Sequence, residues 1–209
     1  MMLGARTAAW GGKTLPYDAE VEWLKPNSIF TEAYIDTGVD SADDVGFDVT
    51  LAKMENVSSD NVATGVRYGA GDTRYFIGAT VAGKWYFGWN TRIDFHQCVA
   101  GEICNFWFNF LNDRSFRYSG QKFADVPSKY SYGMRIMLHA YRSNVNVGYT
   151  VGTNHVFRFY RFKISVGSEI VRDFKPVRVG DAGCWCDALT NTIYPNIGTG
   201  FFDKGPDKT

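Results

Sequence analysis

The sequence lacks both a long hydrophobic run and an excess of charge of one sign. No apolar stretch reaches the length of about 18 residues that a membrane-spanning helix requires, so no membrane span is predicted. Lysine plus arginine number 22, as do aspartate plus glutamate, and the net charge is +0. The densest basic set, Arg158, Arg161 and Lys163, lies within a strand-like segment. We therefore expect no nucleic acid among the partners.

Residues that carry out chemistry are few and far apart. The three histidines, His96, His139 and His155, stand in no H-x-x-x-H pattern and beside no nucleophile motif. No serine occurs as G-x-S-x-G, and residues 69–73 (GAGDT) lack the lysine of a phosphate-binding loop. These absences argue against an enzyme, and no cofactor is expected.

The cysteines do not match a metal site. They lack the paired C-x-x-C knuckles of a zinc ribbon. Cys184 and Cys186 are two residues apart, which places both side chains on one face of a strand. Buried free thiols are favoured for all four cysteines, and a disulfide between Cys98 and Cys104 is left open.

What the chain does contain points to β-structure. Aromatic residues make up 16% of the sequence, and such side chains suit pleated, half-buried surfaces. The 22 glycines supply the tight turns that short strands need. From Tyr17 onward, apolar and polar residues alternate with period two, and helical periodicity is weak. The pattern predicts an all-β fold, an antiparallel sandwich or barrel.

Several segments predict individual strands. The segments at 75–81 and 84–89, joined by Ala82-Gly83, predict a hairpin. Alternation over 104–110 predicts a core strand with phenylalanines on one face and a partly polar outer face. Strands are predicted over residues 47–52, 75–81, 84–89, 104–110, 135–141, 145–151 and 160–166.

Two segments carry a family resemblance. Residues 33–39 read AYIDTGV, with Glu22-Trp23-Leu24 upstream, and the run from 159 to 205 contains RDFKPVR, Asp187 and YPNIGTGF. They resemble the opening and closing strands of concanavalin A-like (laminin-G-like) jelly-roll domains, found in phage structural proteins and bacterial surface proteins. The resemblance covers about residues 17–206, with the middle matching in strand pattern only. Cys186 departs from it, since the family has tyrosine at this place.

The resemblance implies structural roles for single residues. Gly38 and Gly200 suit positions where φ is positive or the backbone is crowded. Pro176 can end a ladder at a sheet edge. Asp36 and Asp187 are interpreted as carboxylates that cap turns or backbone N–H groups.

Glycoside hydrolases of the laminarinase type share the jelly-roll fold, so the resemblance also admits a catalytic function. Those enzymes carry Glu-x-Asp-x-x-Glu on one strand, with two carboxylates close enough for hydrolysis. The acidic segment at 18–22 (DAEVE) has a different order and length, and it precedes the opening strand. No catalytic residue is predicted. Asp40, Asp43 and Asp44 fit a solvated turn better than a calcium site, and no metal site is predicted.

The first 16 residues differ from the rest of the chain. They are small, glycine-rich and poorly periodic, which predicts an irregular N-terminal arm before a sandwich over residues 17–209. Trp10 within the arm is expected to dock on its own domain or on a neighbour, and the arm is expected to attach to other virion proteins or to mediate self-association. Met1 to Trp10 lacks the apolar segment of a secretory signal, so synthesis in the bacterial cytoplasm is expected.

Jelly rolls commonly bind sugars through aromatic rings. The predicted ligand-binding residues are Trp85, Trp89, Asn90 and Arg92, because an aromatic ring beside amide and guanidinium groups suits a polyol such as a host polysaccharide. Weaker candidates are Tyr86, Trp107, Tyr130 and Tyr132.

The resemblance implies two alternative functions. The first is a non-enzymatic structural protein of a phage or prophage virion, part of a fibre, a tail or the capsid surface. The second is a carbohydrate-binding module or lectin-like domain at the bacterial cell surface. Arm-dependent assembly would favour the first, and a glycan-binding monomer the second.

Overall fold

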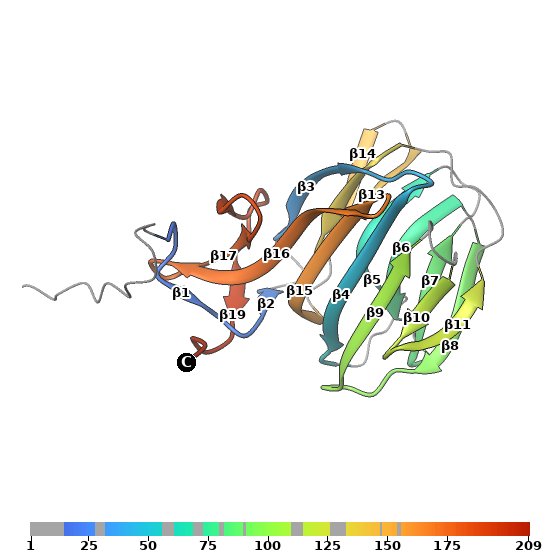
Figure 1. Cartoon of the computed structure of the whole chain (residues 1–209), viewed down its shortest axis with the longest axis horizontal. Helices are drawn as coiled ribbons and strands as arrows, with labels where there is room; N and C mark the ends of the chain where they lie inside the picture. Colours follow the sequence, from blue (N-terminus) through green and yellow to red (C-terminus); the bar gives the residue numbers. More distant parts are fainter. Residues whose placement is uncertain are drawn as a thin grey trace, which may run out of the picture.

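The computed structural model describes residues 15–27, 32–55, 61–68, 73–79, 82–89, 91–109, 115–125, 133–146, 148–153 and 156–209. This part of the chain folds into strands joined by turns and contains no helix (Figure 1). No helix in the described ranges is therefore long and apolar enough to cross a membrane. The all-β prediction is confirmed. Trp10 and residues 1–14 of the predicted arm lie outside the described residues.

The larger sheet is antiparallel and contains most of the C-terminal half. Its strands run in the order β11 (Gln121–Asp125), β10 (Ser115–Tyr118), β9 (Ile103–Asn109), β4 (Val45–Lys53), β15 (Phe157–Val166), β16 (Glu169–Val179), β17 (Ala182–Asp187) and β18 (Thr192–Tyr194). Three short strands extend it at one end: β1 (Ala19–Glu20) pairs with β16, and β2 (Leu24–Pro26) lies between β15 and β19 (Phe202–Lys204).

The second sheet covers one side of the first. Its strands run in the order β14 (Gly148–Thr153), β13 (Ala140–Asn146), β5 (Asn61–Tyr68), β6 (Thr73–Ala79), β7 (Lys84–Trp89) and β8 (Thr91–Gln97). β12 (Arg135–Leu138) pairs with β5 at Thr64 and Gly65, next to β13, and also pairs with β3 (Ile35–Asp40). The ladders of this second sheet are antiparallel, except for the parallel ladder between β13 and β5.

Aromatic rings from both sheets fill the space between them. Phe87 of β7 stacks on Phe116 of β10, with ring centroids 4.4 Å apart, and meets Phe47 of β4 at 6.0 Å. Trp85 of β7 lies edge-on to Phe106 of β9 at 4.9 Å. Because both sheets contribute to one buried cluster, the predicted antiparallel sandwich is confirmed.

The alternation seen in the sequence positions the core as predicted in β4 and β9. Phe47, Val49 and Leu51 are buried, and so are Cys104, Phe106 and Phe108. The predicted hairpin is also present, since β6 and β7 pair from Tyr75 opposite Trp89 to Ala79 opposite Trp85.

Two predicted strands have a different course. The prediction over 145–151 is wrong, because β13 and β14 form a hairpin in which Asn146 pairs with Gly148. The prediction over 160–166 misses a β-bulge: Phe159 pairs with Leu51 and Arg161 with Thr50, leaving Tyr160 as the extra residue. The bulge moves the alternation by one position, so Phe159 and Phe162 both face the core.

His139 interrupts the strand predicted over 135–141. Its φ is 66°, in the left-handed region, and it separates β12 from β13. Before it, Met137 pairs with Gly65 on an antiparallel ladder; after it, Tyr141 pairs with Gly65 on a parallel one. The chain therefore turns sharply at a fully buried histidine.

Pro176 lies inside β16 rather than at the end of a strand. The ladder with β15 reaches Phe174, and the ladder with β1 starts at Val177. The carbonyl of Pro176 accepts a hydrogen bond from the N–H of Val21 (3.1 Å). The missing N–H of Pro176 faces the same side, at the junction of two ladders, where a proline is tolerated. The predicted ladder end at Pro176 is therefore confirmed on the side of β15 and β1, whereas the ladder with β17 continues past it.

Both ends of the described chain meet at one pole of the molecule. Val21 forms a β-bridge with Asp207, and the N–H of Lys208 donates to the carbonyl of Glu20 (2.8 Å). In Figure 1, β1, β17 and β19 lie at this pole, whereas β8, β10 and β11 lie at the opposite one.

Candidate functional site

The predicted ligand-binding residues do not form one exposed group. Trp85 has 0% of its surface exposed and packs against Phe106 and Phe157 in the core. The structure corrects Trp85 from a ligand contact to a core residue, because neither face of its ring is open to a sugar. Alternation along β7 could have shown this, since Trp85 and Phe87 share the inner face.

Trp89 is the last residue of β7, and Arg92 lies near the start of β8. Trp89 pairs with Thr91 at the end of this hairpin, as expected for a strand end. The Arg92 guanidinium lies 4.6 Å from the ring centroid of the buried Tyr86, and its Nε is 2.5 Å from Oδ1 of Asp94. Asn90, Tyr130, Tyr132 and the Trp89 side chain lie outside the described residues, so the ligand site predicted at this hairpin stays a prediction.

A row of polar and aromatic side chains crosses the outward face of the larger sheet. Cross-strand pairing places five residues side by side on neighbouring strands: Arg117 of β10, Trp107 of β9, Asp48 of β4, Lys163 of β15 and Asp173 of β16. We call these five residues the Trp107 row. Their strand neighbours Phe47, Phe106, Phe108, Phe116, Phe162 and Ile164 face the core, so the row faces outward.

Hydrogen bonds and ion pairs hold the side chains of the row in place. Oδ1 of Asp48 accepts a hydrogen bond from Nδ2 of Asn105 (2.7 Å), and its Oδ2 lies 3.6 Å from Nζ of Lys163. Asp173 receives two hydrogen bonds from Arg161, from Nε (2.8 Å) and Nη2 (2.6 Å). A bidentate pair of this kind fixes both partners in orientation.

The Trp107 row borders a surface hollow of about 200 Å³. The half-buried ring of Trp107 lies beside Asp48 and Lys163, while β15 adds Ser165 and the turn between β15 and β16 adds Ser168. An aromatic ring next to a few carboxylate, ammonium and hydroxyl groups matches the chemistry of a sugar, which has apolar ring faces and hydroxyl edges. Trp107 had been a weaker candidate in the sequence, where nothing revealed its cross-strand neighbours.

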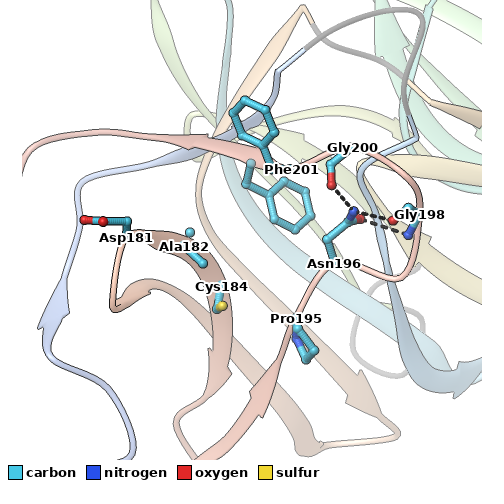
Figure 2. Close-up of a pocket in the computed structure, with 10 residues that line it drawn as sticks. Asp181, Ala182, Cys184, Pro195, Asn196, Gly198, Gly200 and Phe201 are labelled. Atoms are coloured by element: carbon cyan, nitrogen blue, oxygen red, sulfur yellow. Dashed lines mark hydrogen bonds between the residues drawn. The ribbon is translucent and has the colours of Figure 1, made fainter.

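A larger hollow of about 490 Å³ lies near the C-terminus (Figure 2). Its main polar side chain, Asn196, is already engaged: Oδ1 accepts from the N–H groups of Tyr34 (2.8 Å) and Gly198 (3.1 Å). The Asn196 Nδ2 group donates to the carbonyls of Gly198 (2.8 Å) and Gly200 (2.7 Å). Asn196 therefore holds its own loop in shape, which makes this hollow a weaker candidate for a polar ligand.

Three glycines bear on the closing loop and on the backbone of β3. A Cβ on Gly198 would lie 2.1 Å from the carbonyl oxygen of Glu32, so no other residue fits there. Gly200 does not adopt a positive φ; its N–H donates to the same carbonyl (2.8 Å). Gly38, in contrast, has the predicted positive φ, of 75°.

Asp36 and Asp187 act as the predicted capping carboxylates. Asp36 Oδ1 accepts from the N–H of Gly38 (2.9 Å). The fully buried Asp187 accepts from the N–H groups of Asp173 and Leu189 and from the hydroxyl of Thr190, each at 3.1 Å. These contacts account for both residues structurally.

The acidic segment at 18–22 is held by basic groups. Glu20 pairs with Lys175 and accepts from the hydroxyl of Tyr17. Burial opposes ionisation of Glu20, but the hydrogen bond and charge of Lys175 outweigh it and lower the pKa of the carboxyl. Asp18 Oδ2 accepts from the N–H of Gly180 (2.7 Å). Over the described ranges, no group of three or more His, Cys, Asp or Glu could hold a metal ion.

The cysteines are free and buried, as predicted. Cys184 and Cys186 share one face of β17 with Val177 of β16, in a small cluster separate from the main core. Cys104 lies 3.3 Å from the hydroxyl of Tyr118. Burial raises the pKa of Cys98 to about 12, so its thiol is unreactive at neutral pH.

Comparison of the chain with protein-family models, with curated proteins and with solved structures finds no match.

Proposed function

We propose that this chain is a non-enzymatic structural protein of a phage or prophage virion, a concanavalin A-like jelly roll that a fibre, tail or capsid displays for attachment to a host-surface glycan. The support is the sequence resemblance, the β-sandwich and one observation above all. The half-buried ring of Trp107 lies among polar side chains on an outward face of the sheet.

The position of the Trp107 row suits display. The two ends of the described chain meet at the pole of β1 and β19, while Trp107 lies on β9, near the other end of the molecule (Figure 1). A domain attached at the first pole would present the Trp107 end of the row away from its anchor. The N-terminal arm, with Trp10, is the proposed attachment segment to other virion proteins or to further copies.

A bacterial carbohydrate-binding module or lectin-like surface domain is the alternative. It would use the same Trp107 row, and it would act without the arm. The two proposals differ in assembly, so assembly decides between them.

The first experiment compares the full-length chain with a variant that lacks residues 1–16. Size-exclusion chromatography with light scattering measures the molar mass of each. A trimer or larger assembly that becomes a monomer on deletion supports the virion protein. A monomer in both cases, together with glycan binding, supports the carbohydrate-binding module.

The second experiment locates the ligand site. A glycan array identifies a ligand, and titration then compares the unmodified chain with Trp107→Ala, Trp89→Ala and Phe201→Ala. Phe201, 60% exposed beside the larger hollow, is the matched control. We expect Trp107→Ala to weaken binding by about tenfold or more, the loss of one aromatic stacking contact and its buried area. Weakening by Phe201→Ala instead would place the ligand in the other hollow.

A further inference from the structure

The larger hollow near the C-terminus lies beside an unpaired stretch of strand edge (Figure 2). β18 pairs with β17 only over residues 185–187 of β17. Over residues 182–184, which line the hollow, no strand in the described part of the chain pairs with this side of β17. The N–H and C=O groups along a strand edge of this kind are a template for one more extended segment.

The loop that borders the hollow holds a large apolar side chain open to solvent. Phe201 is 60% exposed and lines the hollow. The backbone of Phe201 is fixed, because its N–H donates to Oδ1 of Asn27 (3.2 Å) and its carbonyl accepts from the N–H of Asn27 (3.1 Å). A preformed pocket with an apolar wall and an open strand edge suits a partner that supplies an extended backbone and one large apolar side chain.

The start of the described chain and the hollow lie on opposite edges of one ribbon of strands. Val177 and Arg178 of β16 pair with β1 on one side and with β17 on the other. Asp18 holds the chain start on the β1 side: its N–H donates to the carbonyl of Arg178 (2.9 Å), and its Oδ2 accepts from the N–H of Gly180 (2.7 Å). A segment that leaves from one edge and a receptor on the other edge can join copies head to tail.

The N-terminal arm contains a segment that fits this receptor. Its single large aromatic residue, Trp10, stands between Ala8-Ala9 and Gly11-Gly12. Small neighbours of this kind let a backbone approach a strand edge closely. From Asp18 back to Trp10 the chain spans at most about 29 Å when extended, which is about six strand spacings. Trp10 can therefore reach well beyond the ribbon on which its own chain starts.

We propose that the hollow receives Trp10 from the arm of a neighbouring copy, and that the arm backbone pairs with β17 at residues 182–184. This inference rests on the proposed function, since it names the partner of the arm and the surface that the arm binds. To reach the hollow of its own copy, the arm would have to cross the turn between β16 and β17 to the far edge of its own ribbon. A rotation between copies brings the two edges together directly, and repeating the contact closes a ring.

A ring of this kind leaves the glycan site uncovered. The chain ends and the hollow lie near the pole of β17 and β19, whereas Trp107 lies on β9, near the other end of the molecule (Figure 1). Copies joined at the first pole therefore hold their Trp107 ends outward.

The first test measures self-association of the full-length chain by sedimentation velocity over a series of concentrations. Trp10→Ala removes the inserted ring, while Phe201→Asp and Ala182→Arg each place a charge in the hollow. Val99→Asp is the matched control, because Val99 is 57% exposed and does not line the hollow. Phe201 and Ala182 are both exposed, so their replacement removes no core packing, and thermal melting checks the fold of every variant.

A mixing experiment distinguishes a neighbouring copy from the same copy. A chain without residues 1–16 keeps its hollow but has no arm, whereas the Phe201→Asp chain keeps its arm but has a charged hollow. Each should be a monomer alone. Mixed, they should form a one-to-one complex, because one arm and one hollow remain to pair. Adding Trp10→Ala to the chain that carries the arm should abolish the complex.

We expect Trp10→Ala, Phe201→Asp and Ala182→Arg each to weaken self-association by about thirtyfold or more, the loss typical of an anchor residue, and Val99→Asp to leave it unchanged. Arm-dependent assembly that survives both hollow variants overturns this inference alone and leaves the proposed function standing. Equal weakening by Val99→Asp, or a mixture that forms no complex, also overturns it. A full-length chain that is a monomer at every concentration overturns it too, and removes the assembly that the virion protein is expected to show.

Discussion

Acid should destabilise this protein through a single buried histidine. His139 is 0% exposed, and neither ring nitrogen has a hydrogen-bond partner among the described residues. Its ring is surrounded by the rings of Phe159, Trp185 and Phe202, with centroids at 4.5, 5.5 and 4.9 Å. This apolar burial lowers the pKa of His139 to about 3, so the imidazole stays neutral in the folded chain.

The pH range of the effect follows from the two pKa values. Unfolding returns the imidazole to its ordinary pKa of about 6.5, so below that pH the unfolded chain binds a proton that the folded chain refuses. The contribution to stability is complete above the unfolded pKa and is lost progressively as the pH falls toward the folded pKa of about 3. Between about pH 7.5 and about pH 5, His139 alone should lower the free energy of unfolding by about 2 kcal/mol.

The free energy of unfolding is measured by urea denaturation at both pH values, with tryptophan fluorescence as the signal. The unmodified chain is compared with His139→Asn. Asparagine tolerates the φ of 66° and does not titrate. Carboxylates contribute equally to both chains, so the difference between their pH dependences isolates His139. A difference below about 0.5 kcal/mol would refute the reasoning, because it would mean that His139 is protonated or solvated in the folded chain.

Three further predictions concern the closing loop, the buried carboxylate and the thiols. Gly198→Ala should lower Tm by about 5 °C, because its Cβ would meet the Glu32 carbonyl, whereas Gly133→Ala, with its nearest contact at 3.9 Å, should leave Tm unchanged; equal effects would contradict this. Asp187→Asn should cost about 2 kcal/mol in urea denaturation, since an amide cannot accept from all three donors, and an unchanged midpoint would count against it. A thiol reagent at neutral pH should label no cysteine in the folded chain and four after denaturation; rapid labelling of the native chain would show that the thiols are open to solvent.

The strands could be predicted wherever the alternation is regular and local. In β4 and β9 every second residue is apolar, and the burial of Phe47, Val49, Phe106 and Phe108 follows directly. Irregular positions could not be predicted in this way. The bulge at Tyr160 and the turn at His139 depend on the partner strands, and a histidine within a strand-like pattern does not by itself indicate a positive φ.

The candidate site was harder to predict than the fold for a related reason. Arg117, Trp107, Asp48 and Lys163 are far apart in the chain and become neighbours only through the register of four strands. The prediction relied on residues that are close together in the sequence, such as Trp85 and Trp89, although Trp85 alternates in step with Phe87 and lies with it in the core.

The meeting of the chain ends has a mechanical consequence. Force that pulls Val21 and Asp207 apart acts first on the single bridge between them and on the hydrogen bond from Lys208 to Glu20. These contacts break one after another, and the aromatic interior carries no load until they have separated. A particle that held this chain by both ends would therefore load a few surface hydrogen bonds before it strained the fold.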